Sequence, residues 1–160
     1  VYDGALYACQ NDDAKQRRSK RAVWGMAAIL TVAVAAGGCI PAPGMQNCFY
    51  VLLPYLGEFL GAASVIWALA KLGMDWGTVR EYNYKKSVAV LPVRTAVTAV
   101  FSGLGIVCEL IFFFVNDHAG QTFFALLYVL LKLTALLSAL VLRAEIMQAE
   151  WDKLPKKDNS

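Results

Sequence analysis

The sequence predicts an all-α integral membrane protein, a bundle of four transmembrane helices with both termini in the cytoplasm. Two observations predict this class. Of the 160 residues, 58% are hydrophobic and 17% are charged, whereas soluble domains average about 45–50% apolar and about 25% charged residues. Four stretches of about 20 residues each are also free or nearly free of charge, which is the length that crosses a bilayer as a helix. One soluble core of this size cannot bury so many apolar side chains.

The four apolar stretches are continuous rather than alternating, so they predict helices and not the strands of a barrel. They cover residues 22–40, 49–70, 95–115 and 122–142. Basic residues before the first stretch, and the small residues that end at Cys39, loosely resemble a lipoprotein signal peptide. Cleavage there would leave three spans and retain positive tails on the wrong side of the membrane. We therefore expect the first stretch to remain as the first helix.

The distribution of Lys and Arg predicts the orientation in the membrane. Of the 15 basic residues, all but one lie in residues 1–21, 71–94 and 143–160, and the connections 41–48 and 116–121 contain none. Because cytoplasmic segments are enriched in Lys and Arg, we expect both termini to be cytoplasmic and the plasma membrane to be the location. The net charge of +3 then needs no nucleic-acid partner. Contact of a polybasic tail with anionic lipid is an additional alternative.

The chain is predicted to be one transmembrane domain with two tails. Residues 1–21 form a basic cytoplasmic tail with little periodicity, which is expected to be loose. Residues 22–142 form the four-helix domain. Residues 143–160 extend the fourth helix and end as a cytoplasmic tail, because Pro155 stops a helix and the apolar residues before it recur at helical spacing: Met147, Trp151 and Leu154.

The third and fourth spans each have one polar face and one apolar face. On a helical wheel, Ser102 shares the polar face of the third span with Glu109, and Tyr128 shares that of the fourth span with Lys132. The opposite faces are rich in Leu, Val, Ile and Phe and are expected to contact lipid. Small residues on the polar faces predict close helix packing. These faces are therefore expected to turn toward one another.

Three charged residues within the spans are the main candidates for a binding site. Measured from the outer ends of their spans, Glu58, Glu109 and Lys132 lie about 13, 9 and 15 Å deep, which lets them share one cluster. Burying a charge costs about 2.5–3.5 kcal/mol on the most lenient scale, so we expect Lys132 to pair with Glu58, Glu109 or both. Two interpretations remain: a structural ion pair, or a proton-coupled or cation-binding site in which the excess carboxylate holds a proton near neutral pH. Tyr128 and Ser102 are further candidate members of this site.

The cysteines are the second set of candidate residues. Cys39 and Cys48 bracket the first outer connection, and a disulfide between them is easily closed and fits an oxidising exterior. Free, packed cysteines are the alternative. Four-helix membrane thiol oxidoreductases depend on a close Cys-x-x-Cys pair, which this sequence lacks. Redox catalysis is therefore the least favoured function.

No other motif predicts catalysis, a cofactor or a metal site. His118 is the only histidine, and beside Asp117 it is better explained as part of a solvated turn. Catalytic-triad order, phosphate-binding glycine loops and zinc-ligand spacings do not occur. The sequence therefore predicts a non-catalytic function without a cofactor. A membrane subunit, with the bilayer and another membrane protein or a second copy as partners, is slightly favoured over a small transporter or ligand-binding bundle.

Overall fold

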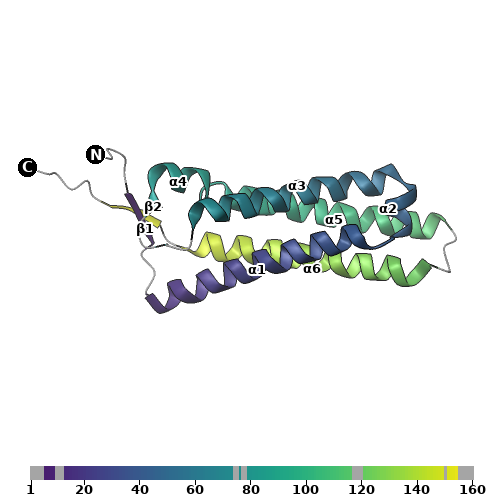
Figure 1. Cartoon of the computed structure of the whole chain (residues 1–160), viewed down its shortest axis with the longest axis horizontal. Coiled ribbons are helices and arrows are strands. Elements are labelled where there is room, and N and C mark those ends of the chain that lie inside the picture. Colours follow the sequence, from purple (N-terminus) through teal and green to yellow (C-terminus); the bar gives the residue numbers. More distant parts are fainter. Residues whose placement is uncertain are drawn as a thin grey trace, which may run out of the picture.

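The computed structural model describes residues 6–9, 13–73, 76, 79–116, 121–149 and 151–154. Four long helices run side by side (Figure 1): α1 (Asp13–Cys39), α3 (Phe49–Leu72), α5 (Leu91–Val115) and α6 (Thr122–Gln148). The short helix α2 (Pro43–Asn47) lies at one end of the bundle, here called the α2 end. The opposite end, here called the sheet end, holds α4 (Glu81–Lys86) and the strands β1 (Leu6–Cys9), β2 (Val79–Arg80) and β3 (Trp151–Lys153).

All four long helices are long and apolar enough to cross a membrane, as the sequence predicted. At the α2 end they stop within one residue of the predicted spans, and at the sheet end every helix extends past them. The extension is longest in α1, whose first turns are built from residues of the tail that was expected to be loose. That expectation is wrong for residues 13–21, because the helix continues outward from the apolar span, and for residues 6–9, which form β1.

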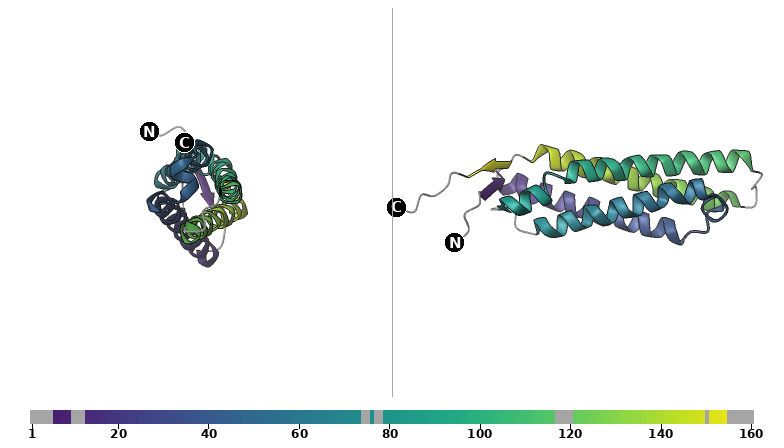
Figure 2. Two further views of the ribbon diagram at one scale, coloured as in Figure 1. Left: turned by 90° about the vertical axis from the view of Figure 1, so that its right-hand side faces the viewer. Right: turned by 90° about the horizontal axis from the view of Figure 1, so that it is seen from above.

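The long helices form a ring in which α3 packs on α5, α5 on α6 and α6 on α1. The contact between α1 and α3 is much less extensive. Figure 2 shows this ring end-on, with the sheet at one end of the bundle axis. Short connections make helices that follow one another in the chain antiparallel. The ring is least tightly closed between α1 and α3.

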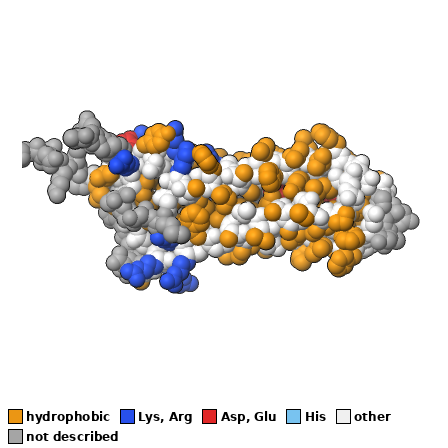
Figure 3. Space-filling view, viewed as in Figure 1, with side chains coloured by type: hydrophobic (Ala, Val, Ile, Leu, Met, Phe, Trp, Pro, Cys, Tyr) orange, Lys and Arg blue, Asp and Glu red, His pale blue; other side chains and the backbone are white. Residues whose placement is uncertain are grey.

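The two faces of α5 and α6 are divided as the helical wheels predicted. Side chains on the predicted lipid faces are exposed, among them Val100, Leu104, Val107, Ile111, Leu126, Leu130 and Leu137. Side chains on the predicted inner faces are buried, among them Thr98, Ser102, Glu109, Ala125, Tyr128, Lys132, Ala135 and Ala139. On the face that Figure 3 shows, hydrophobic side chains are spread along the bundle, and Lys and Arg gather at the sheet end. An apolar exterior around a polar interior is typical of a helix bundle in lipid.

The sheet end joins three distant parts of the chain. The antiparallel strands have the order β2-β1-β3, with Leu6 opposite Arg80 and Tyr7 opposite both Val79 and Lys153. The predicted helix through Trp151 and Leu154 is wrong, because α6 ends at Gln148 and residues 151–153 are extended. Residues 151–153 pair with the backbone of β1 instead of continuing the helix. The ring of Trp151 also packs against those of Trp76 and Tyr84.

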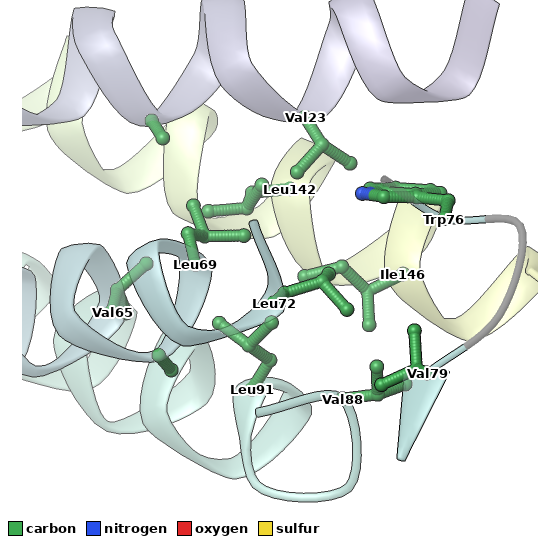
Figure 4. Close-up of a cluster of buried hydrophobic side chains, with 12 residues drawn as sticks. Val23, Val65, Leu69, Leu72, Trp76, Val79, Val88, Leu91, Leu142 and Ile146 are labelled. Atoms are coloured by element: carbon green, nitrogen blue, oxygen red, sulfur yellow. The ribbon is translucent and has the colours of Figure 1, made fainter. Parts of the chain in front are cut away.

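Beneath this sheet lies an apolar core, here called the sheet-end cluster. It brings together α1, α3, α5, α6 and the segment between α3 and α5 (Figure 4). Its buried members are Val23, Ala27, Val65, Ala68, Leu69, Leu72, Trp76, Val79, Val88, Leu91, Leu142 and Ile146. The predicted turn at Asp117 and His118, like the tail from Pro155 onward, lies outside the described residues.

Candidate functional site

Glu58 of α3 and Lys132 of α6 form an ion pair in the middle of the bundle. Lys132 Nζ donates to Glu58 Oε2, and the two side chains are 2% and 0% exposed. Among the partners that the sequence left open for Lys132, the structure places Glu58 in direct contact. Opposite charges that leave water together offset much of each other's desolvation, provided that hydrogen bonds satisfy the remaining polar atoms.

Ser102 of α5 supplies one of those hydrogen bonds. Its hydroxyl donates to Glu58 Oε1 over 2.6 Å, so both oxygens of the carboxylate have a partner. Ser102 Oγ also lies 3.0 Å from the backbone oxygen of Thr98, one turn earlier in α5. The Glu58 carboxylate thereby connects three of the four long helices.

Two tyrosine rings enclose the ammonium group of Lys132. Its Nζ lies 4.6 Å from the ring centroid of Tyr55 and 5.0 Å from that of Tyr128. Aromatic faces attract cations, and the attraction is stronger where water is excluded. Tyr55 was missed in the sequence, although its position three residues before Glu58 places both on one face of a helix. We call Tyr55, Glu58, Ser102, Tyr128 and Lys132 the ion-pair cluster.

Gly38 leaves space for the Tyr55 side chain of this cluster, whereas a side chain at Gly105 would be tolerated beside Lys132. A Cβ atom on Gly38 of α1 would overlap Tyr55 Oη, which donates a long hydrogen bond of 3.5 Å to the backbone oxygen of Val34. A Cβ on Gly105 of α5 would be in ordinary van der Waals contact with the end of the Lys132 side chain. The Tyr55 ring therefore spans from α3 to α1 only because residue 38 has no side chain.

Tyr128 is fully buried, and its hydroxyl has no hydrogen-bond partner among the described residues. The phenol lies within electrostatic range of the carboxylates of both Glu58 and Glu109. A buried hydroxyl without a partner forfeits about 1–3 kcal/mol relative to one in water. The Tyr128 hydroxyl therefore has unused capacity for a hydrogen bond.

Glu109 is buried on α5 and takes a different partner from Glu58. The backbone N–H of Gly44 in α2 donates to Glu109 Oε1 over 3.4 Å. A Cβ on Gly44 would overlap the carboxylate, so a glycine is needed for this approach. Glu109 thereby connects α5 to α2. The sequence left Glu58, Glu109 or both as partners of Lys132, and the ion pair in the structure is with Glu58.

Gly57 and Gly61, one turn apart on α3, pack directly against α5. A Cβ on Gly57 would overlap the ring of Phe101, and one on Gly61 would lie 2.6 Å from Thr98 Oγ1. These glycines bring α3 close to α5, which positions Glu58 against Ser102. Close approach through small residues is the usual source of helix association in lipid.

All four cysteines are free thiols in the structure. Cys39 is exposed, whereas Cys48 and Cys108 are half-buried. The expected Cys39–Cys48 disulfide is therefore not formed in this structure, and it stays a prediction for the chain in an oxidising exterior. The described residues contain no group of three His, Cys, Asp or Glu side chains that could hold a metal ion.

Comparison of the chain with known protein families, curated proteins and solved structures finds no match. A functional assignment therefore depends on the chemistry of the chain's own residues.

Proposed function

We propose that this chain is a non-catalytic membrane protein that acts as a subunit of a larger membrane assembly. The observation that carries the proposal is an uncharged groove of about 330 Å³ on the outside of the bundle, between α1 and α3. Its walls are Thr31, Val34, Ala35, Phe59, Ala62, Ala63, Ile66, Trp67 and Ala70. This is the place where the ring of helices is least tightly closed.

The occupant that suits this groove is a transmembrane helix of a second membrane protein. Thr31 and Ala35 lie one turn apart on α1, and Ala63 and Ala70 lie two turns apart on α3. Small side chains on both walls let a third helix approach along its length and gain van der Waals contacts. By contrast, the charges of the ion-pair cluster are bonded to each other within the chain, so they are not offered to a partner helix.

Filling the groove tests this proposal. In complexes isolated from native membranes in mild detergent, we expect Ala63→Trp to lose a co-purifying membrane protein that the unmodified chain retains. Leu137→Trp is the matched control, because Leu137 is 60% exposed on α6, away from the groove. Retention of the same partner by Ala63→Trp and Leu137→Trp would overturn the proposal. A dimer of this chain that only Ala63→Trp disrupts would instead identify the occupant as a second copy.

We further propose that both termini are cytoplasmic and that the membrane is the plasma membrane. The support is the gathering of Lys and Arg at the sheet end, while the described α2 end has none. Single cysteines introduced in a cysteine-free background test it. An impermeant thiol reagent on sealed cells is expected to label Gln46→Cys and Gln121→Cys but not Asn83→Cys. Labelling of Asn83→Cys from outside would contradict this orientation.

A second candidate function is proton or small-cation binding and transport within the bundle. The observation that favours it is the buried Tyr128 hydroxyl, which has no described hydrogen-bond partner and lies near two carboxylates. If this candidate is correct, liposomes containing the protein dissipate a pH or sodium gradient faster than empty liposomes, and Tyr128→Phe slows the flux. Equal rates with and without the protein would exclude it.

A further inference from the structure

A second groove lies on the other side of the bundle, between α5 and α6. It has a volume of about 380 Å³ and, unlike the groove between α1 and α3, it contains a charge. Its lining is Pro92, Val93, Ala96, Val97, Val100, Phe101 and Arg143. All of these except Arg143 are apolar residues of α5. The groove is thus apolar along one helix and carries a single cation from the other.

The Arg143 side chain lies at the sheet end of the groove. Pro92 is in the first turn of α5, and Arg143 is in the last two turns of α6, which runs in the opposite direction. From Pro92 to Phe101 the helix rises about 14 Å toward the middle of the bundle. A molecule that fits this lining has an anionic group at the end of the apolar span and a hydrocarbon chain that extends inward from it.

Arg143 differs from Arg94, the arginine in the first turn of α5. Arg94 Nη1 donates to the backbone oxygen of Ser64 over 2.7 Å, so Arg94 is used in packing α5 on α3. Arg143 forms no ion pair or hydrogen bond with another described residue. Its guanidinium, half-buried at the rim of the groove, therefore keeps its donors for a ligand. Guanidinium groups bind phosphate through two parallel hydrogen bonds.

We infer that this groove binds one anionic phospholipid, with its phosphate on Arg143 and an acyl chain along Val93, Val97 and Val100. The inference requires that the bundle lies in a membrane but is independent of the partner proposed for the groove between α1 and α3. An anionic lipid is favoured over a zwitterionic one because no described acidic residue lines the groove, and because further Lys and Arg gather at the same end.

Native mass spectrometry tests the inference directly. The full chain is purified in mild detergent with equal amounts of phosphatidylglycerol and phosphatidylcholine, and the bound lipid is counted. We expect one retained phosphatidylglycerol, an affinity loss of about fivefold in Arg143→Gln, and loss of either lipid in Val97→Trp. Two matched controls should keep the lipid: Arg18→Gln, which removes an exposed charge from α1, and Val107→Trp, which enlarges an exposed residue of α5 beyond the groove.

Two further measurements distinguish a lipid phosphate from inorganic phosphate, and loss of bound lipid from loss of folded structure. Inorganic phosphate at millimolar concentration should not displace the lipid, because it lacks the acyl chain. Circular dichroism melting confirms that each variant is folded, so that loss of lipid is not loss of structure. If Arg143→Gln and Val97→Trp bind lipid as Arg18→Gln and Val107→Trp do, the inference is wrong. It is equally wrong if phosphatidylcholine and phosphatidylglycerol are retained alike, or if phosphate alone displaces the lipid.

Discussion

The middle of the bundle and its sheet end are both buried, but different interactions stabilise them. In the middle, Glu58, Ser102 and Lys132 come from three helices and bond to one another. At the sheet end, the sheet-end cluster contains only apolar residues and a tryptophan, packed under a small sheet. The two regions lie on the same helices. The same helices therefore use polar contacts in the middle of the bundle and apolar packing at the sheet end.

Lipid and water favour different interactions between helices. Within lipid, apolar side chains gain little by leaving the hydrocarbon, so close packing and polar contacts between helices determine which faces meet. Where water surrounds a helix, burial of apolar area is instead the main stabilising contribution. The ion-pair cluster thus joins α3, α5 and α6 through polar contacts. The sheet-end cluster, which begins within the apolar spans and continues past their ends, packs the helix ends together through apolar contacts.

The largest expected effect comes from breaking the ion pair. Lys132→Met leaves the Glu58 carboxylate buried without its cation, which typically costs about 3–5 kcal/mol. Adding Glu58→Gln removes the uncompensated charge, so the double variant should be more stable than Lys132→Met alone. The free energy or midpoint of thermal unfolding in detergent measures both.

Glu109→Gln, added to Lys132→Met in place of Glu58→Gln, provides the matched control. Glu109 is also a buried glutamate, but it accepts a hydrogen bond from the backbone N–H of Gly44 in α2. Its substitution should therefore not rescue Lys132→Met. Equal rescue by Glu58→Gln and Glu109→Gln, or no destabilisation in Lys132→Met, would contradict the assignment of the pair.

A somewhat smaller effect is expected at the sheet end. Leu142→Ala removes a fully buried side chain from the sheet-end cluster, and such truncations cost about 2–4 kcal/mol. Leu137→Ala, in the same helix, removes a side chain that is 60% exposed on the predicted lipid face and should cost much less. Similar losses of unfolding free energy for the two variants would mean that Leu137 is covered in the native protein.

The sequence predicts the polar middle of the bundle better than it predicts the sheet end. Charge-free runs and helical wheels found the four helices and turned Ser102, Tyr128 and Lys132 inward, because polar residues are conspicuous in an apolar span. The sequence patterns could not identify whether Glu58 or Glu109 is the partner of Lys132, since both carboxylates lie at depths that the Lys132 side chain reaches. That choice depends on how closely α3 approaches α5, which Gly57 and Gly61 determine through contacts with Phe101 and Thr98.

The sheet end was not predicted at all. β1 and β3 are short and lie far apart in the chain, and neither alternates clearly enough to be read as a strand. Helical spacing at Trp151 gave the wrong structure there, because pairing with a distant segment outweighs a weak local pattern. Tyr55 was missed for a related reason, since its role depends on Gly38 of another helix.

A smaller effect is expected from removing the aromatic contact between β1 and α4. The rings of Tyr7 and Tyr84 stack with centroids 4.2 Å apart, and such pairs contribute about 0.5–1.5 kcal/mol. Tyr7→Ser should increase amide hydrogen exchange in β1, β2 and β3 and leave the middle of the bundle protected. Tyr82→Ser, at an exposed ring, serves as control. Faster exchange around Lys132 in Tyr7→Ser would show that the two regions unfold together.

The smallest effect on either region is expected from the predicted disulfide, because Cys39 and Cys48 lie at the α2 end. Protein taken from sealed cells and alkylated without reductant should carry two fewer modifications than reduced protein, by intact mass. Reduction should leave the effects of Lys132→Met and Leu142→Ala unchanged. Full alkylation of all four cysteines without reductant would show that the disulfide is absent.

The order of strands in the sheet has a consequence for biosynthesis. β1 is the first of the three strands to be made, yet it occupies the central position between β2 and β3. During synthesis its two edges remain unpaired until the segment after α3, and then the segment after α6, have emerged from the ribosome. Completion of the sheet therefore marks a chain whose last helix has already been made, and a chain truncated before Trp151 leaves one edge of β1 open to other binding partners.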